Sequence, residues 1–196
     1  GADLVISATG VIPNTEWLPS DSFRKGSDGG LLVDRCMSTS VEDVYAAGDA
    51  CSIQWEDQDT HWFQMRLWTQ ARVQGRFAGL CMAGVADELA LGFNFELFTH
   101  TTRFLGHKVV LLGQYNGQGL EQEASSDMVT YCRTTDAEDD QGVNDLIGSR
   151  PSIGGTFVRV LLLHGRMQGA VLIGDTDLEE TMEHLIMDGL DLSHYG

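Results

Sequence analysis

A short run of small residues that ends in a glycine and a carboxylate is the part of this sequence best suited to chemistry. Residues 44–47 read Val-Tyr-Ala-Ala and are followed at once by Gly48 and Asp49. Alanine and glycine leave room for a ligand to lie close to the backbone. A carboxylate accepts charge-assisted hydrogen bonds from sugar-like hydroxyl groups. The run therefore predicts a site for a hydroxyl-bearing ligand, with one alternative left open, that Asp49 only caps the turn that follows.

Cysteine, histidine and serine patterns indicate no second chemical centre. Cys36, Cys51, Cys81 and Cys132 include no C-x-x-C pair, so no redox dithiol is predicted and we interpret them as buried or incidental thiols. Cys51 is singled out only because it lies two residues after Asp49. The six histidines show no H-x-x-x-H or H-E-x-x-H spacing, so no metal site is predicted. No G-x-S-x-G motif supports a serine hydrolase.

Composition narrows the class of protein further. The 196 residues carry 12 Lys and Arg against 29 Asp and Glu, a formal net charge of −17, which argues against direct binding to nucleic acid. An apolar fraction of 42% is enough for a hydrophobic core, but no stretch approaches the ~20 apolar residues of a membrane span. The chain opens on Gly1 and an apolar run rather than on a leader, so we expect a piece of a longer protein that starts inside a folded domain.

The spacing of apolar and turn-forming residues predicts the elements that must position Asp49. We expect buried strands over residues 3–8 and 44–47, so that Gly48 and Asp49 follow the carboxyl end of the second strand. Ligands of doubly wound α/β sheets bind at that end of the strands. The other expected elements of this half are a hairpin turn at 28–30, a strand over 31–33 and an amphipathic helix over 64–83.

A change of character at residues 86–92 predicts a domain boundary, after which short strands and tight turns prevail. The final helix is expected to begin with a capping box formed by Thr176 and Glu179 and to end at Gly189. The acidic stretch 134–155 is interpreted as a loop insertion. The expected strands are 93–98, 108–112, 128–133, 157–163 and 167–173, with a hairpin turn at His164-Gly165-Arg166 and a buried helical stripe of Leu178, Met182, Leu185 and Ile186.

Two motifs resemble those of a known enzyme family. Residues 39–49 resemble the second flavin-binding motif, T-x(4)-[V/I]-Y-A-x-G-D, of the FAD-dependent pyridine nucleotide-disulphide oxidoreductases. Residues 8–14, Ala-Thr-Gly-Val-Ile-Pro-Asn, resemble the A-T-G-x-x-P-N motif of the same family. Two motifs in the family's order are more specific than either alone. The resemblance implies that Asp49 binds the ribityl hydroxyls of FAD, and it places Gly10 and Gly48 among the cofactor-binding residues.

The resemblance continues into the expected helix. Residues 67–71, Leu-Trp-Thr-Gln-Ala, resemble the family's helix whose N-terminus points at N1 and O2 of the flavin ring. This implies that the backbone N–H groups of Leu67, Trp68 and Thr69 lie nearest the flavin. The positive end of a helix dipole would stabilise the negative charge of reduced flavin. One face of the same helix is also expected to pack on the sheet.

Nearly the whole chain resembles an animal branch of this family, on residues that include 64–72, 95–98 and 167–174. The implied fold class is α/β, with the C-terminal part of a doubly wound FAD-binding domain followed by a smaller α+β domain that has antiparallel strands and a terminal helix. The implied domains are the end of an inserted NAD(P)-binding domain at 1–14, the C-terminal part of the FAD-binding domain at 15–86 and the C-terminal α+β domain at 87–196.

The function implied by the resemblance is that of an FAD flavoprotein that oxidises NAD(P)H in cytoplasm and nucleus and protects the tRNA ligase complex from oxidation. The sequence lacks the family's first G-x-G-x-x-G and its His-x-x-x-x-Glu signature, so the chain alone is expected to be inactive and its catalytic residues stay unassigned. Two alternatives stay open. One is a reductase that passes electrons to an iron–sulfur or other redox partner, and the other is an interaction module, residues 87–196, switched by the flavin.

Overall fold

A computed structural model of the chain describes residues 2–7, 9–19, 22–56, 61–87, 95–135 and 155–195. The chain divides into two compact units. The first comprises residues 1–58 and 64–95, and the second comprises residues 59–63 and 96–196. The family-type motifs at 39–49 and 67–71 both lie in the first unit.

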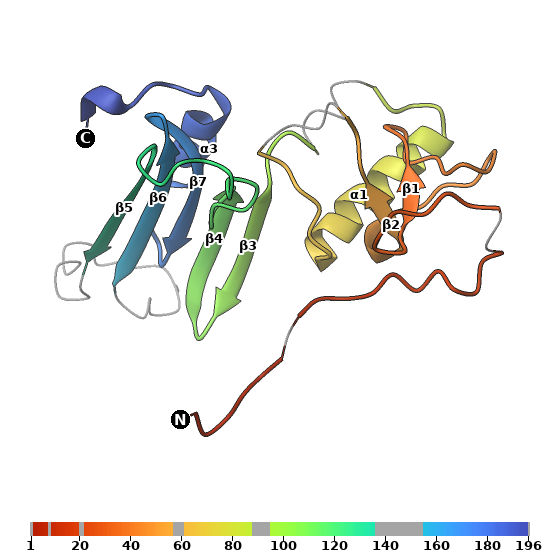
Figure 1. Cartoon of the computed structure of the whole chain (residues 1–196), viewed down its shortest axis with the longest axis horizontal. Coiled ribbons are helices and arrows are strands. Elements are labelled where there is room, and N and C mark those ends of the chain that lie inside the picture. The colour runs from red at the N-terminus through yellow and green to blue at the C-terminus, as the bar shows by residue number, and fades with distance from the viewer. Residues whose placement is uncertain are drawn as a thin grey trace, which may run out of the picture. The chain divides into compact units, whose positions relative to one another are not determined.

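The first unit contains a small parallel sheet and one long helix (Figure 1). Strand β1, Leu31–Val33, pairs in parallel with β2, Cys51–Ile53. The short 3-10 helix η1, Gly48–Ala50, leads directly into β2. Helix α1, Trp68–Met82, packs against η1 and buries Gln74, Phe77 and Ala78. The expected strand at 31–33 is therefore confirmed.

A glycine-rich turn starts β1 where the hairpin turn was predicted. Gly29 has a φ of +86°, and the Gly26 N–H donates to the Gly30 carbonyl at 2.8 Å. The turn brings Lys25 into an antiparallel bridge with Leu31, the first residue of β1. The predicted turn at 28–30 is confirmed, because only a residue that tolerates positive φ allows the chain to reverse so tightly.

Two strands predicted in this half are wrong. Leu4, Val5 and Ile6 are 76–82% exposed, and described residues 2–7 form no strand, while Ala8 lies outside the described residues. A strand exists only where a neighbour completes its backbone hydrogen bonds, and no described segment does so here. Residues 44–47 form only a single bridge, from Tyr45 to Ser38. Gly48 and Asp49 therefore precede strand β2 instead of following a strand.

The long helix begins four residues later than the predicted range of 64–83. Its N-cap, Leu67, has an extended backbone with φ −115° and ψ 145°. The segment before it stays extended because Gln64 Oε1 accepts from the Ile53 N–H at 2.9 Å and Gln70 Oε1 accepts from the Met65 N–H at 2.8 Å. These side-chain contacts replace the helical hydrogen bonds that residues 64–67 would otherwise make. Helix α1 thus starts directly after the segment that is fastened to β2.

The second unit is an antiparallel five-stranded sheet in the order β3-β4-β7-β6-β5. Four strands lie where the apolar patterns predict them, and the hairpin between β6 and β7 is confirmed, since His164 and Gly165 have φ of +48° and +76°. The strand predicted at 93–98 is wrong over residues 95–98, and residues 93–94 lie outside the described part. The strand bounds are β3, Thr99–Phe104; β4, His107–Gly113; β5, Met128–Thr135; β6, Thr156–Leu163; and β7, Arg166–Ile173.

Helix α3, Glu179–Met187, covers one face of this sheet, and η2, Ser193–Tyr195, follows it. The predicted stripe is confirmed, and Gly189, with φ +57°, follows the helix end. The predicted capping box is wrong, because Leu178 is the N-cap and no side chain caps the helix. The core that α3 completes contains Val110, Leu112, Val160, Leu162, Met167, Ala170, Leu172, Met182 and Ile186, with Leu178 and Leu185 partly buried beside them.

Two residues of the expected capping box behave differently in the structure. Glu179 pairs with Lys108 Nζ of β4 at 2.5 Å, so its carboxylate fastens the helix to the sheet. Thr176 Oγ1 is buried and has no hydrogen-bond partner among the described residues. Of the predicted acidic loop, residues 136–154 lie outside the described part, while Thr134 and Thr135 belong to β5.

Candidate functional site

The turn η1 is held tightly against helix α1. Gly48 has a φ of +72°, a conformation that favours glycine, and a Cβ built there would lie 3.1 Å from the Cβ of Ala71. The Gly48 N–H donates to the buried Gln74 Oε1 at 2.7 Å. The absence of a side chain at Gly48 and the amide at Gln74 therefore fix how closely Asp49 lies to the helix.

The buried side chain of Cys51 contacts the backbone of this turn. The side chain is fully buried, and its Sγ donates to the Gly48 carbonyl at 3.3 Å. Gln64 Nε2 donates to the Cys51 carbonyl at 3.0 Å. Burial raises the pKa of the Cys51 thiol to about 11, so the thiol stays protonated at neutral pH. Because the thiolate is the reactive form, Cys51 is a structural residue of the turn.

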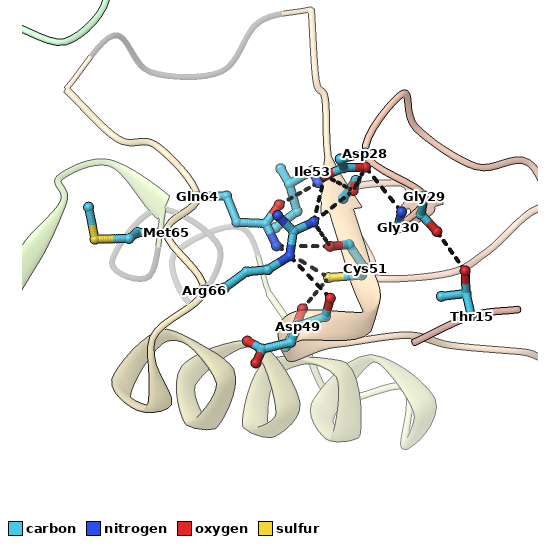
Figure 2. A network of polar contacts seen from close by, with 12 residues as sticks. Thr15, Asp28, Gly29, Gly30, Asp49, Cys51, Ile53, Gln64, Met65 and Arg66 are labelled. Atoms are coloured by element: carbon cyan, nitrogen blue, oxygen red, sulfur yellow. Dashed lines mark hydrogen bonds and ion pairs between the residues drawn. The ribbon is translucent and has the colours of Figure 1, made fainter. Parts of the chain in front are cut away.

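The carboxylate of Asp49 is exposed and makes no hydrogen bond or ion pair with any described residue. Its backbone carbonyl accepts from Arg66 Nε at 3.2 Å. Figure 2 shows the carboxylate pointing away from these dashed contacts. The alternative in which Asp49 caps the following turn is therefore wrong, and its side chain is available to a ligand.

Arg66 joins the turn to the sheet and to the start of α1 (Figure 2). Besides the Asp49 carbonyl, its guanidinium donates from Nη2 to the Cys51 carbonyl at 3.5 Å and to Ser52 Oγ at 3.3 Å. The same Nη2 lies 2.5 Å from Asp28 Oδ2. One cation thus contacts three of the four residues from Asp49 to Ser52.

The Asp28 carboxylate is the acid of this network. It accepts hydrogen bonds from Ser52 Oγ at 2.6 Å and from the Gly30 N–H at 3.0 Å. Burial alone would raise the pKa of Asp28, but the hydrogen bonds from Ser52, Arg66 and Gly30 outweigh it and lower the pKa to about 2. Asp28 is therefore ionised at every physiological pH. The sequence alone places Asp28 only in a turn, at 28–30, and Arg66 only within the amphipathic helix predicted over 64–83.

The N-terminus of α1 is open at the surface. Trp68 is 79% exposed, Thr69 is exposed, and no side chain caps the helix. The Leu67 N–H donates to the Met65 carbonyl at 2.7 Å, so one of the three predicted flavin-facing amides is already engaged. The first turn of a helix carries partial positive charge, which suits an anionic ligand group.

Gly10 stands apart from the other predicted site residues. It has a φ of +95°, and a Cβ built on it would meet no heavy atom within 4 Å. The described structure therefore brings together Gly48, Asp49 and the start of α1, but shows no packing of Gly10 against them.

The described residues contain no group of three or more histidine, cysteine or acidic side chains placed to hold a metal ion. In the same part of the chain, every helix falls short of the length and apolar character that crossing a bilayer requires.

Comparison with known proteins gives a consistent match. The family model described as pyridine nucleotide-disulphide oxidoreductase matches residues 1–75. A protein of Pongo abelii named pyridine nucleotide-disulfide oxidoreductase domain-containing protein 1 is 48% identical over 199 residues, which cover 100% of this chain and 35% of that relative. The chain therefore spans about a third of the length of such relatives.

Solved structures show the same fold at low identity. A NAD-dependent persulfide reductase from A. fulgidus superposes with a TM-score of 0.65 and 22% identity, covering 96% of this chain and 33% of that one. A FAD-dependent pyridine nucleotide-disulphide oxidoreductase from Desulfovibrio vulgaris gives a TM-score of 0.64 and 18% identity, covering 96% and 43%. The likeness extends over both units of the chain.

Proposed function

The chain belongs to the pyridine nucleotide-disulphide oxidoreductase family, and from this membership we propose that it is part of an FAD-dependent enzyme that oxidises NAD(P)H. The observation that carries the proposal is the exposed, unpaired carboxylate of Asp49 on a turn held against the open N-terminus of α1. When bound, FAD would supply the redox chemistry by accepting hydride from the nicotinamide. The protein's part is to bind the cofactor, orient it and tune its charge.

In the proposed site, Asp49 accepts hydrogen bonds from the ribityl hydroxyls of FAD. The exposed carboxylate fits this role because an ionised acceptor forms stronger hydrogen bonds than a neutral one. Gly48 allows the turn to lie close to α1, because a Cβ built at this position would lie only 3.1 Å from the Ala71 Cβ. The exposed start of α1, at Trp68 and Thr69, contributes partial positive charge that favours reduced, anionic flavin.

The resemblance supports several finer proposals. We propose that the intact protein acts in cytoplasm and nucleus and that its partner is the tRNA ligase complex, which it protects from oxidation. Asp49, Gly48 and Gly10 form only part of a dinucleotide site, so we propose that the 196-residue chain alone is inactive. Co-purification of the complex with full-length protein, and flavin assays of the isolated chain, test these statements.

Removing the Asp49 carboxylate tests the flavin site. A hydrogen bond to a charged group contributes about 1.5–3 kcal/mol, so Asp49→Ala in the full-length protein should weaken FAD binding by roughly ten- to more than a hundredfold. Flavin content is read from the absorbance at about 450 nm. Glu42→Ala is the matched control, because Glu42 is an exposed residue in the same unit whose carboxylate makes no hydrogen bond or ion pair with any described residue. Equal flavin content in both variants would contradict the assignment.

A further inference from the structure

Arg66 contacts the backbone of the Asp49 turn and leaves the Asp49 carboxylate alone. Its Nε donates to the Asp49 carbonyl at 3.2 Å, whereas no ion pair joins Arg66 to the carboxylate of the same residue. A guanidinium and a carboxylate usually form a strong bidentate pair when they can reach each other. The absence of an ion pair between Arg66 and the Asp49 carboxylate therefore calls for a structural explanation.

Asp28 supplies that reason. Its Oδ2 lies 2.5 Å from Arg66 Nη2, and Ser52 Oγ and the Gly30 N–H hold the carboxylate in place. The pKa of Asp28, lowered to about 2, keeps the acid ionised and the cation compensated across the physiological range. The Arg66 side chain is only 19% exposed, so water compensates its charge poorly.

We propose that Asp28 and Arg66 are positioning residues that clamp the η1 turn by its backbone carbonyls and keep the Asp49 carboxylate open to the ligand. The inference rests on the proposed function, because the ligand is the ribityl chain of FAD. The Arg66 guanidinium donates hydrogen bonds to the carbonyl oxygens of Asp49 and Cys51, at 3.2 and 3.5 Å. Asp28 forms the ion pair with the same guanidinium. Without Asp28, the guanidinium is free to pair with Asp49 and compete with the ribityl hydroxyls.

Three variants of the full-length protein separate clamping from competition. We expect Asp28→Asn to weaken FAD binding by about tenfold at low salt, because Arg66 then pairs with Asp49. Salt screens a pair near the surface, so much of this loss should disappear at about 1 M salt. Arg66→Gln loosens the turn instead, and its loss should be independent of salt. Arg66→Lys keeps the charge and part of the carbonyl contacts and should bind FAD better than Arg66→Gln.

The double variant is the most discriminating measurement. If Asp28 acts by restraining Arg66, Asp28→Asn should add nothing to the loss already caused by Arg66→Gln. Arg76→Gln is the matched control, since Arg76 is an exposed arginine of α1 whose side chain makes no hydrogen bond or ion pair with any described residue. FAD dissociation constants from flavin fluorescence titration, at low and high salt, give all the comparisons. Far-UV circular dichroism confirms that each variant is folded.

The outcomes distinguish this inference from the proposed function. If Asp49→Ala releases FAD while Asp28→Asn binds it as the unsubstituted protein does, the positioning role is overturned and the flavin site stands. Losses that add in the double variant, or a loss in Asp28→Asn that salt does not reverse, also overturn it. If Arg66→Gln fails to fold, the salt dependence of Asp28→Asn decides alone. If Asp49→Ala retains FAD fully, the proposed function itself fails.

Discussion

Replacing Gly48 with alanine tests how closely the η1 turn must approach helix α1. Gly48 has a φ of +72°, and the new methyl group would lie 3.1 Å from the Ala71 Cβ. Gly84, just after α1, offers a matched control. Its φ is +67°, but a Cβ there meets nothing within 4 Å. The two substitutions share the backbone penalty and differ in the contact with α1.

The expected magnitudes follow from these two terms. A left-handed backbone costs an alanine about 1–2 kcal/mol, which is the whole effect expected for Gly84→Ala. At Gly48 the crowded methyl adds an overpacking cost of about 1–3 kcal/mol. We therefore expect Gly48→Ala to lower the free energy of unfolding by roughly 2–5 kcal/mol. The same shift of η1 should also weaken FAD binding in the full-length protein, whereas Gly84→Ala should not.

A second substitution checks the cause. Ala71→Gly removes the contacting methyl, and as a glycine in a helix it costs about 1 kcal/mol by itself. In the double variant the clash is gone, so the combined loss should be about 1–3 kcal/mol smaller than the sum of the single losses. Urea unfolding followed by circular dichroism at fixed pH measures the unsubstituted protein and all four variants. The reasoning is refuted if Gly48→Ala costs no more than Gly84→Ala, or if the two single losses simply add.

Three further predictions concern the core and the titrating groups. Leu172, fully buried in the second unit, should lose about 2–5 kcal/mol of unfolding free energy when replaced by alanine, whereas Leu190→Ala, 51% exposed, should stay within about 0.5 kcal/mol; urea unfolding compares them. Burial raises the pKa of Cys51 from its usual 9.0 to about 11, so unfolding free energy should fall as the pH rises between these values, and Cys51→Ala should flatten this alkaline limb. Burial would raise the pKa of Glu179, but the hydrogen bond from Lys108 lowers the pKa overall. The contribution of Glu179 to the free energy of unfolding is therefore present above the ordinary carboxyl pKa and is lost as the pH falls through the lowered one. Glu179→Gln should lack this loss of stability at acid pH when unfolding is measured over a pH series.

The apolar patterns predicted the second unit better than the first. Strands β4, β6 and β7 carry alternating or continuous apolar residues because they are central in the sheet, with one face on the core that contains Leu112 and Leu172. Strand β3 lies at the sheet edge and reads Thr-His-Thr-Thr-Arg-Phe, mostly exposed, so no apolar pattern marks it. An apolar pattern in the sequence reflects burial of the strand, so an exposed edge strand such as β3 can lack one.

The errors in the first unit have a different physical cause. Residues 4–6 and 44–47 are apolar or small, as buried strands are, but strand formation depends on a partner that sequence pattern does not reveal. The late start of α1 likewise depends on Gln64 and Gln70 side chains that bind backbone groups of Ile53 and Met65. Each error arises where a contact distant in sequence overrides a local preference.

Within the candidate site, Asp49 and Gly48 could be singled out from the sequence because their types and adjacency suit a ligand without reference to the rest of the chain. Asp28 and Arg66 were not, because they are 38 positions apart and neither type nor spacing links them. Their pairing also matters for an acidic chain, in which 12 basic residues face 29 acidic ones. In such a chain many carboxylates can form an ion pair with each arginine. A carboxylate beside an arginine therefore stays unpaired only where that arginine already pairs with another acid. Asp28 meets that requirement because three hydrogen-bond donors stabilise its ionised form in the place where Arg66 reaches it.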